Sequence, residues 1–163
     1  MEYTLKQKLV SLGNNFTIKD VEGQDAFQVK GALASLGDKL SFQDLDGNEL
    51  AYIEQKVFNW VATYEIWRDG KKAADVSRDL FSFRRHRFSV DTPGPDDLEA
   101  VGDFLNFEYV VNRGERKIAT ITRQLFHLSD TYWVQIDDDE PDPVLVLAIA
   151  VVIEVICHHR HNY

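Results

Sequence analysis

Apolar and polar residues alternate in short runs over most of the chain. Aromatic and β-branched residues recur two positions apart as far as Asp137, in Phe16–Ile18, Phe27–Val29, Leu40–Phe42, Tyr64–Ile66, Phe88–Val90 and Tyr132–Ile136. Alternation with a period of two is typical of strands that bury one face. The chain up to Asp137 is therefore predicted to form a series of β-strands.

Turn signals separate several of these runs, at Asp20–Gly23, Asp44–Gly47, Arg68–Gly70 and Asn112–Gly114. Each contains a glycine together with an Asp or Asn, the residue types that tolerate the positive φ of a tight hairpin. The strands are therefore expected to be joined as antiparallel hairpins.

The sequence also repeats itself at two spacings. Ser11–Gly13 and Asp20–Gly23 recur 24 residues later as Ser35–Gly37 and Asp44–Gly47. In a second repeat, with an offset of 68 residues, the same residue types recur: Ala51, Ile53, Phe58, Thr63 and Tyr64 correspond to Ala119, Ile121, Phe126, Thr131 and Tyr132. The repeats indicate two related halves built from hairpins.

The last segment breaks the alternation. Pro143–Cys157 is apolar on every face and has a single charge, Glu154, while Asp142 and Pro143 suit the N-cap and the first position of a helix. A helix that is apolar all round must be buried in protein or in lipid. Its longest apolar run, Val144–Ile153, is much shorter than the ~20 residues that span a bilayer. We expect a buried helix, with Glu154 near its end and in contact with water.

The number of strands constrains the architecture. About a dozen strands exceed what an open sheet usually holds, which favours a closed barrel or two stacked sheets. A barrel of that size leaves a lumen, and a helix about 10 Å across could fill it. The predicted fold is a mainly β, closed antiparallel barrel of about 12 strands surrounding a central hydrophobic C-terminal helix. One domain covers 1–163, with the barrel at about 1–137, an acidic loop at 137–142 and the helix at about 143–158.

The net charge is −9, from 18 Lys and Arg against 27 Asp and Glu. Ten of the acids lie in two stretches without a basic residue, Asp91–Asp103 and Asp137–Asp142. The rest of the chain is nearly neutral, which argues against a nucleic-acid partner. The single cysteine, Cys157, excludes an intramolecular disulfide, and the N-terminus does not resemble a signal peptide. A cytoplasmic location is expected.

A set of short motifs runs along the chain in a recognisable order. They are Lys8–Gly13, Phe16–Asp20, Val29–Gly31, Ser35–Leu40, Asp46–Glu49 and Thr131–Tyr132, followed by an acidic loop and the apolar Val144–Ile153. The pattern resembles the LURP-one-related family over nearly the whole chain. The resemblance implies the Tubby C-terminal-like fold shared with phospholipid scramblases, a closed barrel of about twelve strands threaded by a hydrophobic C-terminal helix. Small family members have no agreed activity, plant relatives are associated with defence responses, and Tubby domains bind phosphoinositides through basic residues. No Lys or Arg of this chain can be matched to that Tubby lipid site.

The densest basic run, Arg84–Arg87, provides the candidate binding site. Arg84, Arg85 and Arg87 could hold phosphate groups, because a guanidinium forms paired hydrogen bonds with phosphate oxygens. Alternatively, these side chains point outward from a strand and pair with neighbouring acids.

Two other motifs suggest metal sites but fit poorly. Asp44-x-Asp46-x-Asn48 resembles the start of a calcium loop, but Glu49 and Gln55 occupy the positions that need Gly and Glu, which favours a hairpin turn. Cys157–His161 contains thiol and imidazole ligands without a second cluster to complete a site. We expect neither a metal nor a cofactor.

None of the common catalytic motifs is present, and His86 and His127 are isolated in the sequence. The predicted function is therefore non-catalytic binding or scaffolding, with anionic phospholipid head groups or a phosphorylated ligand as the leading candidate. Two alternatives remain. One is a protein interaction module that uses exposed loops such as Asp137–Asp142. The other is a scramblase-like, membrane-associated protein whose helix leaves the barrel. The chain is not expected to be an integral membrane protein.

Overall fold

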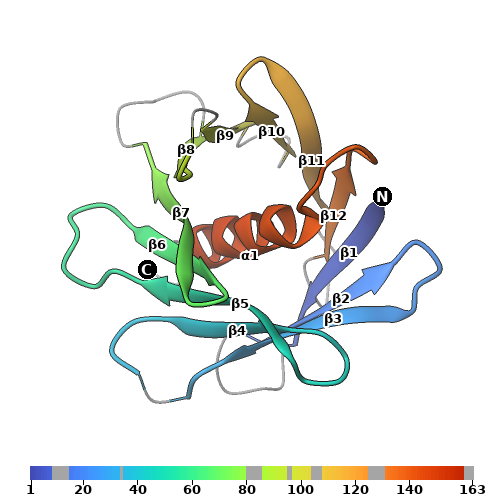
Figure 1. Cartoon of the computed structure of the whole chain (residues 1–163), viewed down its shortest axis with the longest axis horizontal. Helices are drawn as coiled ribbons and strands as arrows, with labels where there is room; N and C mark the ends of the chain where they lie inside the picture. Colours follow the sequence, from blue (N-terminus) through green and yellow to red (C-terminus); the bar gives the residue numbers. More distant parts are fainter. Residues whose placement is uncertain are drawn as a thin grey trace.

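The chain forms a closed ring of antiparallel strands around one helix (Figure 1). The computed structural model describes residues 1–8, 15–33, 35–79, 86–94, 97–103, 108–124 and 131–159. The elements are β1 (Glu2–Gln7), β2 (Phe16–Asp20), β3 (Asp25–Gly31), β4 (Lys39–Gln43), β5 (Glu49–Gln55), β6 (Thr63–Arg68), β7 (Lys71–Arg78), β8 (His86–Asp91), β9 (Leu98–Asp103), β10 (Glu108–Arg113), β11 (Arg116–Gln124), β12 (Thr131–Ile136) and α1 (Pro143–His159).

Pairing of the first and last strands closes the ring. β1 pairs antiparallel with β12 from Glu2↔Gln135 to Lys6↔Thr131, and every other pairing joins strands that follow one another in the chain. The prediction of a closed antiparallel barrel of about twelve strands is confirmed, and the two-sheet alternative is wrong. Closure satisfies the backbone hydrogen bonds that an open sheet leaves unpaired at its two edges.

The helix α1 fills the lumen of the barrel. Alternate strand residues, such as Leu5, Ile18 and Phe42, point inward and are buried against it. Every residue of α1 from Leu145 to Ile156 is buried. The isolated helix would be insoluble, and the ring without it would enclose an unfilled lumen. This explains why the sequence predicts a barrel and a buried helix together.

Capping fixes where α1 begins. The Asp142 carboxylate accepts a hydrogen bond from the Leu145 backbone N–H at 3.1 Å, which confirms the predicted N-cap. The helix ends at His159, slightly beyond the predicted end. In the part of the chain that the structure describes, no helix has the combination of length and hydropathy that crossing a membrane requires.

The repeat with the shorter spacing corresponds to two equivalent hairpin turns. Gly23 and Gly47 have φ of 77° and 88°, conformations that glycine adopts without steric cost. Asp20 accepts a hydrogen bond from the Gln24 backbone N–H at 2.9 Å, and Asp44 accepts one from the Asn48 N–H at 2.8 Å. The Asp44 motif is thus part of a hairpin turn, as predicted. The hydrogen bond from the Asn48 side chain is the main cause of the lowered Asp44 pKa.

The repeat with the longer spacing relates strands on opposite sides of the ring. Ala51 and Ile53 lie in β5 while Ala119 and Ile121 lie in β11, and all four are buried. Tyr64 of β6 and Tyr132 of β12 are equivalent in the same way. The two halves of the sequence therefore build two halves of the barrel, each of six strands.

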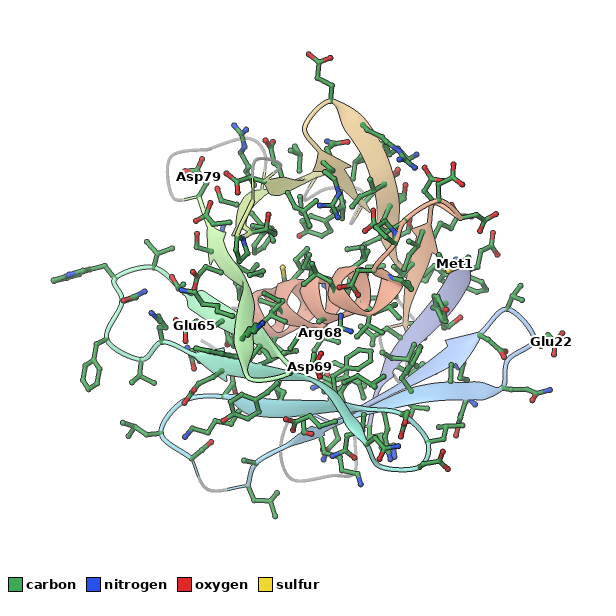
Figure 2. All side chains as sticks on the ribbon, viewed as in Figure 1. Met1, Glu22, Glu65, Arg68, Asp69 and Asp79 are labelled. Atoms are coloured by element: carbon green, nitrogen blue, oxygen red, sulfur yellow. The ribbon has the colours of Figure 1, made fainter. Side chains whose placement is uncertain are left out.

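Antiparallel strands alternate in direction, so the connections fall into two groups at opposite ends of the barrel. We call one the turn end, formed by residues 21–24, 44–48, 69–70, 92–97, 114–115 and 137–142. The other is the loop end, whose connections are residues 8–15, 32–38, 56–62, 79–85, 104–107 and 125–130. α1 begins at the turn end and ends at the loop end. Figure 2 shows Glu22 of the turn end and Asp79 of the loop end on opposite sides of the molecule.

Candidate functional site

Acidic residues are concentrated in the connections of the turn end. Its connections contain no Lys or Arg, and their acidic residues are Glu22, Asp44, Asp46, Asp69, Asp96, Asp97, Glu115, Asp137, Asp138, Asp139, Glu140 and Asp142. Basic groups from the adjoining strands and from the N-terminus neutralise a few of them. This end nevertheless carries a strong excess of negative charge, which would repel an anionic partner.

Ion pairs attach the acidic segment 137–142 to the barrel. Arg113 donates to the buried Glu140 carboxylate at 2.9 Å, and Arg116 donates to Asp137 at 2.6 Å. The pairing with Arg116 is the main reason that the pKa of Asp137 is lowered. These contacts hold the segment that leads into α1, so the role they support is structural.

The loop end differs in both polarity and charge. By sequence, each of its six connections holds at least two large apolar residues. Six of the ten phenylalanines belong to them, namely Phe58, Phe81, Phe83, Phe104, Phe107 and Phe126. Their charged residues are Lys8, Lys56, Arg84 and Arg85 against Asp38, Asp79 and Asp130. By sequence, the connections of the turn end are therefore acidic, and those of the loop end are apolar and weakly basic.

Two neighbouring connections of the loop end carry exposed apolar side chains, which we call the loop pair: Leu33 and Leu36 between β3 and β4, and Val57, Phe58 and Trp60 between β5 and β6. Phe58 is 91% exposed and Trp60 is 102% exposed. These residues were not among the binding residues predicted from the sequence, although Phe58 belongs to one of its repeats. The available signal was an apolar cluster located between two strands, where polar residues are the rule.

The predicted anion site is only partly within the described residues. Arg84 and Arg85 lie outside them, and by sequence they belong to the connection between β7 and β8 at the loop end. Arg87 lies on the outer face of β8, where its guanidinium forms an ion pair with Glu99 of β9. This hydrogen bond is the main cause of the raised Arg87 pKa, so the side chain carries a full charge. Phosphate binding by the three arginines stays a prediction.

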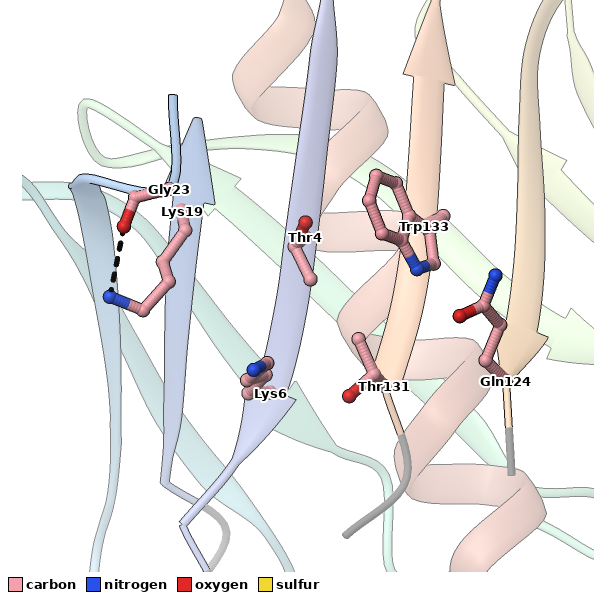
Figure 3. Close-up of a pocket in the computed structure, with 7 residues that line it drawn as sticks. All are labelled: Thr4, Lys6, Lys19, Gly23, Gln124, Thr131 and Trp133. Atoms are coloured by element: carbon pink, nitrogen blue, oxygen red, sulfur yellow. Dashed lines mark hydrogen bonds between the residues drawn. The ribbon is translucent and has the colours of Figure 1, made fainter. Parts of the chain in front are cut away.

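A shallow pocket of about 330 Å³ lies on the outer wall across β2, β1, β12 and β11 (Figure 3). Its cationic groups are Lys6 and Lys19, and the exposed Trp133 forms part of its lining. The Lys19 ammonium donates to Asp25 at 2.6 Å and to the Gly23 carbonyl at 3.2 Å, so much of its charge is already compensated. Lys6 is exposed on β1. The pocket could accept an anion, but more weakly than a cluster of arginines.

The position of Glu154 corrects one prediction. Glu154 is only 1% exposed, so the expectation that it reaches water is wrong. The physical reason is that the barrel covers α1 on all sides from Leu145 to Ile156, so Glu154 lies inside the lumen and not at its mouth. Burial, followed by the Glu154 carboxylate, raises the pKa of Tyr132. Arg123 lies over the same tyrosine ring, 5.8 Å from its centroid.

A second buried contact lies close by in the same part of the lumen. The Tyr109 hydroxyl and the Cys157 thiol are 3.4 Å apart, and burial is the main cause of the raised pKa of both groups. The thiol is therefore protonated near neutral pH and is a poor nucleophile and metal ligand. Within the described part of the chain, no three His, Cys, Asp or Glu side chains are arranged to hold a metal ion.

Comparisons with known proteins agree with this architecture. The family model described as LURP-one-related matches residues 1–154. The uncharacterized protein YxjI of Bacillus subtilis (strain 168) is 30% identical over 162 residues, which cover 99% of this chain and 97% of the relative. A protein from Arabidopsis thaliana with a known X-ray structure aligns with a TM-score of 0.66 at 20% identity, covering 94% of this chain and 91% of that one. This chain belongs to the LURP-one-related family.

Proposed function

We propose that this protein is a non-catalytic binding module that attaches to the phosphate-bearing head groups of anionic phospholipids, with its loop end facing the membrane. The observation that carries the proposal is the separation of charge between the two ends of the barrel. All six connections of the turn end lack Lys and Arg, whereas Arg84, Arg85, Lys8 and Lys56 belong to connections of the loop end.

This distribution orients the molecule near an anionic surface. The carboxylates of the turn end are repelled by the surface, and the basic residues of the loop end are attracted to it. Each Lys or Arg close to an anionic membrane contributes about 1 kcal/mol of attraction. Screening limits the attraction to about 8 Å at physiological ionic strength, so only residues near the loop end take part.

Arginine chemistry suits the proposed contact. A guanidinium presents five N–H donors in a planar fork that matches phosphate oxygens. Arg87 uses an Nη2 donor for Glu99, and its side chain is about half exposed, which leaves donors for a head group. Arg84 and Arg85 precede it in the sequence and supply the remaining charge.

A cytoplasmic location is part of the proposal. The cytoplasmic leaflet carries the anionic phosphatidylserine and phosphatidylinositol lipids of a eukaryotic cell, so a cytoplasmic protein would meet a suitable surface. The chain also has a single cysteine, which fits a reducing compartment. Cell fractionation in the native host, with and without a high-salt wash, would test the location.

Liposome co-sedimentation of the full chain tests the function. Vesicles of phosphatidylcholine alone are compared with vesicles that also contain phosphatidylserine or a phosphatidylinositol phosphate, at low and high salt. We expect binding to anionic vesicles only, and weaker binding at high salt. The triple variant Arg84→Glu, Arg85→Glu, Arg87→Glu should lose this binding.

A matched control changes the same charge elsewhere. Lys71 and Lys117 are exposed near the turn end, so the double variant Lys71→Glu, Lys117→Glu changes the net charge by the same amount as the double variant Arg84→Glu, Arg85→Glu. The arginine double variant should lose most of the binding, whereas the lysine double variant should bind like the wild type. Equal losses in the two double variants, or no binding by the wild type at low salt, would overturn the proposal. Inositol hexakisphosphate provides a further arm, because saturable binding of it without vesicle binding would identify a soluble phosphorylated ligand instead.

A further inference from the structure

The loop pair is held together at its base. The Gln55 backbone N–H donates to the Asp38 carbonyl at 2.8 Å, and the Gln55 side-chain carbonyl accepts from the Asp38 N–H at 3.1 Å. The Tyr64 hydroxyl donates to the Asp38 carboxylate at 2.7 Å. A Cβ placed on Gly37 would lie 2.4 Å from Val57 Cγ1, which shows how closely the two connections approach one another. They therefore move as one unit.

The tips of this unit are apolar and protrude into solvent. Leu33 and Leu36 are 72% and 76% exposed, and Phe58 and Trp60 are almost completely exposed. Isolated apolar side chains are common on protein surfaces, but four or five large ones on two adjoining loops indicate a surface that is covered in use. Hydrogen bonds order the base of the unit, so the two connections that carry the exposed side chains stay next to one another.

We propose that the loop pair inserts into the interfacial layer of an anionic phospholipid bilayer, with Phe58 and Trp60 as the deepest residues. The inference rests on the proposed function for its partner and deepens it by naming the part of the protein that enters the membrane. Trp and Phe suit this layer because their rings fill the boundary between head groups and acyl chains.

The surroundings of the loop pair favour a lipid surface over a protein partner. Lys30, Lys39 and Lys56 lie at the adjoining strand ends, where a lysine stem can run along apolar groups and keep its ammonium at the head groups. Lys39 and Lys56 also form ion pairs with Glu54 and Glu65 on the barrel wall, which compensates part of their charge, but their side chains stay 40% and 43% exposed. The apolar tips project from the barrel, and a projecting surface can enter a bilayer because the bilayer is deformable.

Trp60 offers a direct readout of insertion. The chain has three tryptophans, so the variant Trp67→Phe, Trp133→Phe leaves Trp60 as the only indole. Circular dichroism first establishes that this variant keeps the fold. On addition of vesicles that contain phosphatidylserine, we expect a blue shift of Trp60 emission and strong quenching by lipids brominated on their acyl chains. An unshifted spectrum, or quenching only by an aqueous quencher, while the protein is bound to vesicles would overturn insertion.

Polar substitutions give a second measurement with a matched control. Phe58→Ser, Trp60→Ser should weaken binding to anionic vesicles by more than tenfold and abolish the fraction that resists high salt. Val21→Ser, Leu45→Ser removes two exposed apolar side chains from separate turns at the turn end, where they are 72% and 58% exposed, and should leave binding unchanged. Equal effects of the two variants would overturn the inference.

Different experimental results would overturn membrane insertion and the proposed function. If the arginine variant loses vesicle binding while Trp60 stays in water, head-group binding stands and insertion is wrong. If Trp60 inserts equally into neutral vesicles and the arginine variant binds normally, insertion stands and anionic recognition is wrong. If Trp60 emission shifts with protein concentration in the absence of lipid, the loop pair covers a second copy of the chain, and insertion is overturned.

Discussion

Arg68 Nη1 lies 2.6 and 2.7 Å from the two carboxylate oxygens of Asp142, the residue that caps α1. The contact joins the last residue of β6 to the start of the helix, across a long separation in sequence. It sets the point at which α1 enters the barrel.

Replacing Asp142 should therefore destabilise the protein. Asp142→Ala removes both the N-cap and a partly exposed ion pair, so we expect the free energy of unfolding to fall by about 1–2 kcal/mol. Urea denaturation followed by circular dichroism measures the change. Asp139→Ala, in the same acidic segment, should have little effect, and Asp142→Asn should recover the contribution of the cap. A loss no larger than that of Asp139→Ala would show that the cap contributes nothing.

Gly102 of β9 is paired with Tyr109 of β10, and a Cβ at this position would lie 2.1 Å from two carbon atoms of the tyrosine ring. Gly102→Ala must displace the ring and disturb its contact with Cys157. We expect a destabilisation of about 1–3 kcal/mol, typical of overpacking. The cost should be much smaller in a Tyr109→Ala background, which a double-mutant cycle of urea denaturation measures. Equal costs in both backgrounds would contradict the overpacking.

Buried tyrosines predict a loss of stability in alkali. Burial is the main cause of the raised pKa of Tyr64, Tyr109 and Tyr132. Above a pH of about 10 the unfolded chain releases these protons while the folded protein keeps them, so stability is complete below this pH and falls above it. Each tyrosine contributes a slope of up to about 1.4 kcal/mol per pH unit.

The same experiment can assign the slope to a residue. Unfolding by urea at a series of alkaline pH values gives the free energy of unfolding for the wild type and for Tyr64→Phe. The variant should show a shallower decline because it has one fewer proton to lose. Parallel declines would mean that Tyr64 ionises in the folded protein about as easily as in the unfolded chain.

Removing the helix should abolish the fold. A chain that ends at Asp142 lacks the buried residues of α1, so the barrel would enclose a lumen with nothing to fill it. We expect an insoluble product, or one without a cooperative thermal transition in circular dichroism. A soluble truncation that melts cooperatively would contradict the role of α1 as the core.

The sequence predicted the barrel because its signals are local and repeated. Alternation in strands such as Phe16–Asp20 and Tyr132–Ile136, and glycines such as Gly23 and Gly47 in the turns, depend on neighbouring residues alone. The apolar segment after Asp142 had too few residues for a membrane and too many for the surface, so it indicated the filled lumen as well.

The surface proposed to bind the membrane could not be predicted in the same way. Exposure of Phe58 and Trp60 depends on where a connection projects from the closed ring, and an apolar cluster in sequence suggests burial by default. Burial of Glu154 depends on the full length of α1 and on Tyr132 and Arg123, which come from strands elsewhere in the chain. Arg84 and Arg85 lie outside the described residues, and the vesicle experiments test their role directly.

Closure of the ring also limits how this protein can associate. Each of the twelve strands that the structure describes has a hydrogen-bonded neighbour on both sides, including β1 and β12. Strand addition, in which a peptide or a second molecule extends a sheet at a free edge, would require the barrel to open first. Self-association and partner binding by the closed barrel must therefore use side chains or the connections, and the folded molecule resists the edge-to-edge pairing that leads open sheets to aggregate.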